Sequence, residues 1–301
     1  MTHDGRAGVA TAPCPLCAHG GGRVVLRIHA RRMVRCHRCG LVYRDPLPAR
    51  ADAGAPLVLG PAERAREERV AERRRGPFER LLAEAGPPAR LLDVGAGLGY
   101  FVKLAGERGW QATGVDVDAA AVEYARRVLG VDVRHGDLRD LHLPAASFDL
   151  VTLWNLLECV ADPVNVLREV RRVTAPAGRV FIRTQNAVWH LTSYRASRLL
   201  RRFGIGANPA RGAYVAYIFN AVCFSAPTLR DLLVRTGFKP VRVVNSPPVP
   251  GDPYLGLSSP AERALGLAKR GVFAAVQAGA ALTRGRWLMG PSIEAWGRRA
   301  E

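Results

Sequence analysis

The feature that most constrains the fold is a regular alternation of apolar strands and amphipathic helices that begins after Pro87 and Pro88. Strands are expected at 90–95, 111–118, 131–137, 148–155 and 178–186, with helices at 99–109, 119–130 and 161–175 between them. Alternation of this kind predicts parallel strands joined by helical crossovers. We therefore expect an α/β fold: a doubly wound, mostly parallel sheet with helices on both faces.

The loop after the first expected strand is rich in glycine. Gly95, Gly97 and Gly99 stand between strand and helix, where the backbone approaches a ligand closely and needs positive φ angles. A dinucleotide-binding loop has the spacing GxGxxG, and Tyr100 occupies the position of its last glycine. Asp93 lies two residues before Gly95. The loop therefore predicts a cofactor site for a molecule other than a dinucleotide.

Acidic residues end the next two strands. Asp116 lies 17 residues after Gly99, where a carboxylate can accept both hydroxyl groups of a ribose. Asp118 is a second candidate for this role. Asp116 is favoured because it stands at the end of the strand. Asp137 follows the third strand and can accept from an adenine amino group, with Leu138 offering a backbone contact. A single such acid can be an ordinary helix cap, whereas three at consecutive strand ends favour a nucleoside site.

These motifs resemble the class I methyltransferases, in particular a bacterial group with a zinc ribbon ahead of the catalytic domain. The resemblance covers about residues 14–45 and 88–240 and rests on CPLC…CHRCGLVYRDP, LLDVGAGLGYF, VDVD, SFDLVTLWNLLECVADPVNVLREVRRVTAPAGRVFI and FSAPTLRDLLVRTGF. It implies a Rossmann-like fold and S-adenosylmethionine as cofactor. An acid suits this loop because that cofactor carries an ammonium and a sulfonium and has no pyrophosphate. The expected cofactor contacts are Asp93, Gly95, Gly97, Gly99, Asp116, Val117, Asp137, Leu138 and Asn155.

Two CxxC pairs precede this domain. Cys14 and Cys17 are separated from Cys36 and Cys39 by 18 residues, which is zinc-ribbon spacing. Four thiolates complete a tetrahedral site and leave no open position, so we expect a structural Zn²⁺. A redox CxxC would be single and would lie near a βαβ unit.

The chain divides by composition into five segments. The Pro/Gly/Ala-rich stretch 45–61 marks the clearest boundary. A helix within 63–85 is expected to break near Gly76 and Pro77. We expect a disordered lead-in (1–13), a zinc ribbon (14–45), a linker with an N-terminal helix (46–85), the methyltransferase domain (86–251), and a helical insertion followed by the last strand of the sheet (252–301).

Charge and hydropathy bear on partners and location. The formal net charge of +18 favours contact with phosphates, nucleic acid or an anionic membrane, although an Arg-, Ala-, Gly- and Pro-rich composition also follows from GC-rich coding. The first residues do not form a secretory signal, and the uncharged segment 271–283 is too short to span a bilayer. We expect a cytoplasmic protein. The basic stretch 195–211 and the apolar helix near 261–288 motivate a hypothesis of peripheral contact with the inner membrane surface.

The expected reaction is methylation, most simply at oxygen, of a small molecule, a sugar or a lipid-linked acceptor. Relatives commonly carry histidines where Cys159 and Asn220 stand, so a family-style catalytic base is missing. An in-line displacement at carbon gains most from proximity and alignment, and a base is optional. If a base acts, the candidates are His190 and Glu158, followed by Tyr194 and Tyr217.

Two other functions fit part of the sequence. An RNA methyltransferase could use the ribbon and the positive charge to hold a phosphate backbone. Against it, the ribbon has only Tyr43 for stacking, and WNLLEC lacks an Asn-Pro-Pro-Tyr-type motif. The two missing histidines motivate a third possibility, a non-catalytic zinc-ribbon binding protein with a decayed site. The intact glycine loop and strand-end acids oppose it.

Overall fold

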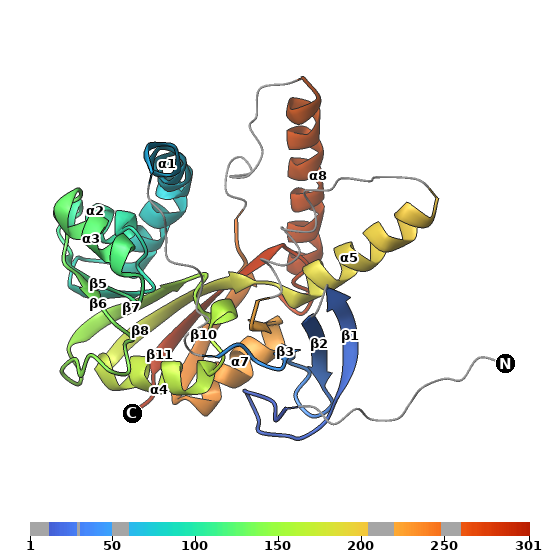
Figure 1. Ribbon diagram of the computed structural model, residues 1–301, viewed down its shortest axis with the longest axis horizontal. Helices are drawn as coiled ribbons and strands as arrows, with labels where there is room; N and C mark the ends of the chain where they lie inside the picture. The colour runs from blue at the N-terminus through green and yellow to red at the C-terminus, as the bar shows by residue number, and fades with distance from the viewer. Residues whose placement is uncertain (1–11, 29–30, 50–59, 204–219, 248–259) are drawn as a thin grey trace.

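The computed structural model describes residues 12–28, 31–49, 60–203, 220–247 and 260–301 (Figure 1). Most of the expected lead-in and linker, residues 1–11 and 50–59, lies outside the described residues. The same holds for 204–219, which includes Tyr217 and part of the basic stretch, and for 248–259.

Seven strands form the central sheet, in the order β10-β11-β8-β7-β4-β5-β6. Strands β4 to β8 run parallel, and β11 runs antiparallel to both of its neighbours. The doubly wound, mostly parallel sheet is therefore confirmed, and the C-terminal segment SIEAWGRR is its last strand in the chain. The strands are β4 (Arg90–Val94), β5 (Gln111–Asp116), β6 (Val133–His135), β7 (Phe148–Trp154), β8 (Thr174–Gln185), β10 (Phe238–Asn245) and β11 (Ser292–Arg299).

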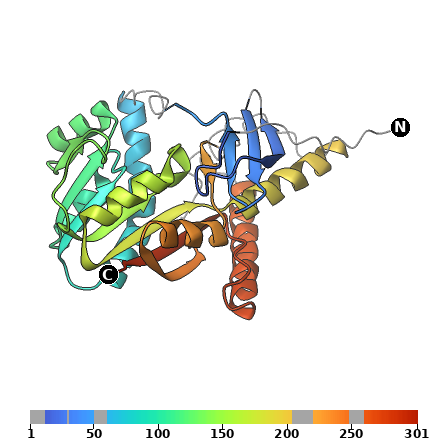
Figure 2. The ribbon, with the colours of Figure 1, turned by 90° about the horizontal axis from the view of Figure 1, so that it is seen from below.

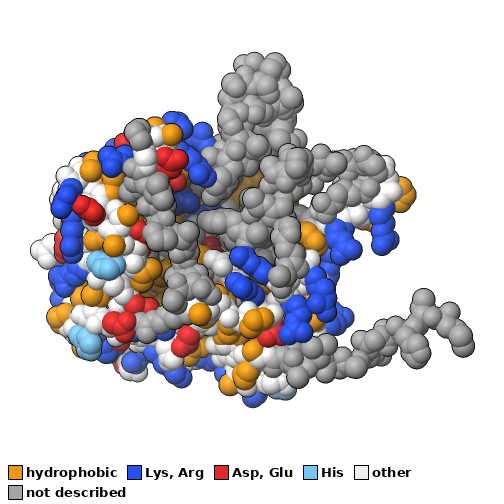
Figure 3. Space-filling view, in the orientation of Figure 1, with side chains coloured by type: hydrophobic (Ala, Val, Ile, Leu, Met, Phe, Trp, Pro, Cys, Tyr) orange, Lys and Arg blue, Asp and Glu red, His pale blue; other side chains and the backbone are white. Residues whose placement is uncertain are grey.

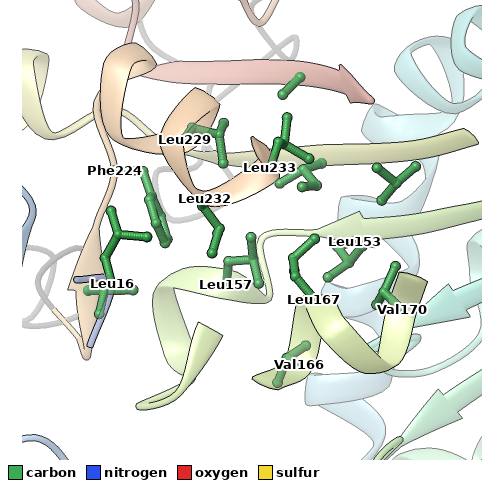
Figure 4. Packing of buried hydrophobic residues seen from close by; sticks show 14 of the residues in the cluster. Leu16, Leu153, Leu157, Val166, Leu167, Val170, Phe224, Leu229, Leu232 and Leu233 are labelled. Atoms are coloured by element: carbon green, nitrogen blue, oxygen red, sulfur yellow. The ribbon is translucent and has the colours of Figure 1, made fainter. Parts of the chain in front are cut away.

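Helices cover both faces of this sheet (Figures 1 and 2). Alternate residues of one strand point to opposite sides, so Leu91 packs under one helical layer and Leu92 under the other. The first layer contains α1 (Pro61–Ala85), α2 (Tyr100–Glu107) and α3 (Ala119–Arg127). The second contains α4 (Pro163–Val173) and α7 (Ala226–Arg235), whose leucines and valines meet in Figure 4.

Helix α1 is continuous, so the expected break near Gly76 and Pro77 is wrong. A proline inside a helix removes one hydrogen bond and costs about 3 kcal/mol. The next turn offsets this cost, because Phe78, Leu81 and Leu82 are buried against the sheet. Packing of the apolar face therefore outweighs the local preference.

The cysteine-bearing segment forms a second, antiparallel sheet in the order β1-β2-β3-β9. Its first three strands are β1 (Gly22–Ile28), β2 (Arg31–Cys36) and β3 (Val42–Asp45). The fourth, β9 (Val222–Cys223), lies between α5 and α7 in the sequence and pairs with β3. The ribbon also shares the main core, since Leu16 lies near Phe224 in Figure 4 and belongs to the same apolar cluster.

Two helices project from the body of the molecule (Figure 1): α5 (Ala187–Arg202) and α8 (Pro260–Leu282). The inner ends of both helices lie near Asn186, which directly precedes α5 and is fully buried. Its Nδ2 donates to the carbonyl oxygens of Leu288 (2.8 Å) and Gly290 (2.9 Å), just after α8. Within the described ranges, none of the helices is both long enough and apolar enough to span a bilayer.

A chain of polar side chains ties α1 to the carboxyl ends of the strands. Arg80 donates to both carboxylate oxygens of Glu294, at 2.8 and 2.9 Å. The Glu294 side chain has no exposed surface, whereas that of Arg80 is 32% exposed. Ser246 also donates to Glu294, at 2.8 Å, and accepts a hydrogen bond from Arg183 at 2.9 Å. The Arg80–Glu294 pair therefore fixes α1 over the sheet.

Removing the cation of this pair should destabilise the protein. Arg80→Met leaves the Glu294 carboxylate buried without its counter-charge, and we expect the free energy of unfolding to fall by about 2 kcal/mol or more. Arg75→Met is the matched control, because Arg75 forms a solvent-exposed pair with Glu79 and its loss should change stability by less than about 0.5 kcal/mol. Urea denaturation measures both. Equal losses in the two variants would contradict the assignment, and Arg80→Met/Glu294→Met should recover much of the loss.

Candidate functional site

The glycine loop connects β4 to α2 with all three glycines at positive φ: 77° at Gly95, 53° at Gly97 and 82° at Gly99. A Cβ at Gly95 would lie 3.0 Å from Leu156, and one at Gly99 would lie 2.9 Å from Ala125. At Gly97 a Cβ would meet nothing within 4 Å. Gly95 and Gly99 therefore serve packing, and Gly97 presents open backbone to the site.

Asp116 holds this loop in shape. Its Oδ2 accepts from the backbone N–H of Gly97 at 2.7 Å, and its Oδ1 accepts from that of Asp118 at 2.9 Å. Asp118 instead caps α3 through the N–H groups of Ala120 and Ala121. A carboxylate offers about four acceptor positions, so Asp116 retains capacity for two ribose hydroxyls. The neighbouring Val117 side chain is half exposed.

Asp93 is a buried carboxyl at the end of β4. It accepts a hydrogen bond of 2.6 Å from the Thr152 hydroxyl on β7. Burial raises the pKa of Asp93 to about 7, the Thr152 hydrogen bond lowers it, and the negative charge of Asp116 adds to the rise. A cationic ligand beside Asp93 would favour the ionised form and would itself be stabilised.

A cavity of about 150 Å³ lies between this loop and α1. Asp93, Gly95 and Gly97 line one side, and Glu67 and Arg74 of α1 line the other. An ammonium and a carboxylate can therefore both find opposite charges here. The sequence did not single out Glu67 or Arg74, because α1 looks like any charged helix until the fold lays it over the loop.

Aromatic side chains form the apolar part of the cavity wall. Trp154 contacts Phe78 edge-on, with ring centroids 4.8 Å apart, and Phe101 at 5.5 Å. The cavity is lined by all three. The Trp154 Nε1 is buried and has no hydrogen-bond acceptor among the described residues. These three rings therefore give the cavity an apolar wall.

Asp137 lies next to Asp116 in the fold, because the Gly136 N–H donates to the Asp116 carbonyl at 2.8 Å. Its carboxylate holds the Arg139 side chain in a two-point pair, at 2.9 and 2.6 Å. Leu138 is buried. An adenine amino group would therefore share the Asp137 carboxylate with Arg139, and the contacts expected of Asp137 and Leu138 stay predictions.

Asn155 and Glu158 meet just after β7. The Asn155 Nδ2 donates to Glu158 Oε1 at 2.8 Å, and its Oδ1 accepts from the Arg183 guanidinium. Glu158 is buried, and its Oε2 accepts from Thr184 at 2.8 Å. Burial raises the Glu158 pKa, against the lowering effect of these hydrogen bonds. The pair is held rigidly between β7 and β8.

His190 lies at the root of α5. Its Nε2 is 2.9 Å from the Pro291 carbonyl oxygen, and burial lowers its pKa to about 4. A neutral imidazole that donates from Nε2 ties α5 to Pro291, the residue before β11. Tyr194 packs against the ribbon through the cluster that contains Met33. The catalytic roles of His190 and Glu158 stay predictions.

The four cysteines converge at the start of the ribbon. Their sulfur atoms all lie within 4.8 Å of one another, with Cys14–Cys39 and Cys17–Cys36 both at 3.6 Å. Four sulfurs bound about 2.3 Å from one tetrahedral zinc would lie about 3.8 Å apart. The cluster therefore has the donor set and the spacing that a zinc ion requires.

Comparison with known proteins decides the family. Residues 64–243, more than half of the chain, match a family model described as a methyltransferase domain. This chain belongs to the methyltransferase-domain family. The matched range contains most of α1, the glycine loop, the strand-end acids, Asn155 and Glu158.

Individual relatives match part of this domain. A probable S-adenosylmethionine-dependent methyltransferase of Mycolicibacterium smegmatis is 35% identical over 99 residues, 33% of this chain and 38% of that protein. A ubiquinone biosynthesis O-methyltransferase of Hahella chejuensis is 35% identical over 106 residues, 33% of this chain and 44% of that protein. The matches thus span about two fifths of these curated relatives.

Solved structures share the fold. An S-adenosylmethionine-dependent methyltransferase from Archaeoglobus fulgidus has a TM-score of 0.50 at 16% identity, over 76% of this chain and 94% of its own. One from Thermotoga maritima, described as a possible histamine N-methyltransferase, has a TM-score of 0.50 at 18% identity, over 79% and 95%. They support the Rossmann-like architecture of the methyltransferase domain.

The raised pKa of Asp93 predicts that cofactor affinity depends on pH. The cationic end of S-adenosylmethionine should prefer ionised Asp93, so the dissociation constant should increase as the pH falls below about 7, by up to about tenfold per unit. Asp93→Asn should bind weakly with little pH dependence. Asp132→Asn, at an exposed carboxyl, is the control. Calorimetric titrations across this range measure the effect, and a wild-type affinity that stays constant would contradict it.

Arg74 is expected to bind the carboxylate of the cofactor. A charged hydrogen bond of this kind contributes about 1.5–3 kcal/mol, so Arg74→Met should weaken binding of S-adenosylmethionine and S-adenosylhomocysteine by about tenfold or more. Arg69→Met is the matched control on the same helix, since Arg69 is exposed and does not line the cavity. Equal affinities of the two variants would show that α1 makes no such contact.

Proposed function

We propose that the protein is an S-adenosylmethionine-dependent methyltransferase that methylates an oxygen atom of a small molecule, a sugar or a lipid-linked acceptor. The observation that carries this proposal is the buried Asp93 carboxylate in a cavity that also contains the open backbone of Gly97 and the Arg74 guanidinium. The names of the ubiquinone biosynthesis O-methyltransferases among its relatives support oxygen as the attacked atom.

When bound, S-adenosylmethionine would supply an electrophilic methyl group on a sulfonium that leaves readily. The protein's own part is to bind and orient. Asp93 and Glu67 would hold the ammonium, Arg74 the carboxylate and Asp116 the ribose. Val117 and Leu138 would contact the adenine. Trp154, Phe78 and Phe101 would exclude water, and this arrangement supplies the proximity and alignment on which an in-line transfer depends.

We propose a positioning role for Glu158. Its carboxylate fixes Asn155 on the loop after β7, beside Leu156, which touches Gly95. Glu158→Gln keeps the size of the side chain and removes its charge. If the role of Glu158 is positioning, the activity of this variant should fall without a shift in its pH profile. If Glu158 were the catalytic base, the substitution would remove the acidic limb of the profile.

The acceptor class can be tested directly with methyl-labelled S-adenosylmethionine. The protein would be incubated with phenolic and sugar acceptors, a lipid-extractable fraction of cells and total RNA, with Asp93→Asn as the inactive control. We expect label in a low-molecular-weight or lipid-extractable product, attached through oxygen. Label in RNA, or no transfer by a protein that binds the cofactor, would contradict the proposal.

We further propose that the cysteine cluster holds a structural zinc ion. Its four thiolates would complete the coordination shell, so the ion would stabilise the ribbon and would not act on substrate. Cys36→Ser/Cys39→Ser should lose about one zinc per chain by elemental analysis and melt at a lower temperature. Cys159→Ser, outside the cluster, should retain the metal. Unchanged metal content in the double variant would contradict the assignment.

A further inference from the structure

The ribbon and α5 together form a strongly basic surface. Between Cys14 and Asp45 the sequence has seven arginines and one acid, and α5 has four arginines and no acid. Helix α5 packs on the ribbon sheet, since Leu191 and Tyr194 contact the cluster of Leu26 and Met33. Figure 2 shows α5 beside the ribbon strands. Charges that are separate in the sequence therefore lie on one side of the molecule.

The strand register places ribbon arginines on the same sheet face as α5. Met33 lies on that face, so Arg31 and Arg35, two residues away on either side, share it. Arg23 is the cross-strand partner of Arg35, and Arg44 is that of Met33, so both share the face as well. Figure 3 shows blue side chains gathered at the edge of the molecule below the outer end of α5. We call Arg23, Arg31, Arg35, Arg44 and α5 the arginine face.

Part of this charge is unfavourable in the isolated protein. Arg23 lies directly opposite Arg35, and like charges at opposed positions of a sheet destabilise it. In the part of the chain that the structure describes, no carboxylate forms an ion pair with Arg23 or Arg35. The same applies to Arg195 and Arg198 of α5. An anionic partner would relieve this repulsion.

The outer end of α5 adds apolar side chains to the charge. Leu199 is 56% exposed and Phe203 is 72% exposed, and they lie one helical turn apart. Arg195, Arg198 and Arg202 surround them and are also exposed. Arginine around exposed Leu and Phe is the pattern of a helix that lies in a lipid headgroup layer with its apolar side chains below.

We propose that the arginine face docks on an anionic phospholipid bilayer, with Leu199 and Phe203 inserted between the lipid headgroups. Lipid phosphates would neutralise the opposed arginines, and the acyl layer would bury apolar surface that a nucleic acid backbone would leave in water. Since α5 begins directly after β8, docking would hold the carboxyl edge of the main sheet close to the membrane. The inference does not depend on methyl transfer.

Vesicle flotation of the full, zinc-loaded protein tests this proposal without cofactor or acceptor. Vesicles would contain phosphatidylcholine alone or phosphatidylcholine with phosphatidylglycerol. We expect binding only to the anionic vesicles, and weakening as the salt concentration rises. Each arginine near an anionic surface contributes about 1 kcal/mol, so Arg195→Gln/Arg198→Gln should weaken binding by about tenfold or more. Arg127→Gln/Arg134→Gln removes two exposed arginines from α3 and β6 and should have little effect.

The contribution of the two apolar side chains distinguishes membrane binding from nucleic acid binding. Leu199→Ser/Phe203→Ser should weaken vesicle binding and keep its salt dependence, and thermal melts would verify that every variant folds. Total RNA is the competing arm. If RNA binds more tightly than anionic vesicles and Leu199→Ser/Phe203→Ser changes neither, the membrane proposal is wrong. Equal losses in both arginine variants would overturn it as well, because binding would then follow net charge and not this surface.

Discussion

The structure depends on the burial of the central strands on both faces. Leu91, Leu150 and Phe181 pack under α1 and α2, while Leu92 and Leu153 pack under α4 and α7. Such strands leave little room for unpaired polar groups between the layers. Polar side chains therefore gather at the carboxyl ends, where the Thr152 hydroxyl meets the Asp93 carboxylate. The position of the candidate cofactor site follows from this constraint.

The same edge of the sheet is braced by a continuous polar chain. It runs from Glu158 through Asn155 and Arg183 to Ser246, and then to Glu294 and Arg80. Each group in it satisfies another in a region of low dielectric constant, where an unpaired group would be costly. The chain thereby links the loop after β7 to α1, which forms one wall of the cavity. A displacement of α1 would therefore be transmitted through these hydrogen bonds to Asn155.

The ribbon and the methyltransferase domain form a single packed unit. Strand β9 completes the ribbon sheet, and the Ala221 N–H next to it donates to the Glu158 carbonyl at 2.9 Å. A metal ion at the cysteines would thus support, through β3 and β9, the one-turn helix Leu157–Cys159, which carries Glu158. The arginine face extends from this shared unit, so the cysteine cluster, the candidate cofactor site and the basic surface belong to one framework.

The sequence alone determined the parallel sheet, the glycine loop and the convergence of the four cysteines, because each depends on local periodicity or spacing. It also favoured Asp116 over Asp118 for the ribose contact, which stays a prediction, while the structure shows that Asp118 caps α3. Only the tertiary structure decided that α1 continues through Pro77, since packing of Phe78 and Leu82 outweighs the local cost. Only it placed Arg74 in the cavity, His190 against Pro291, and β9 in the ribbon sheet. These contacts join residues far apart in the chain, and no local pattern encodes which partner a surface will meet.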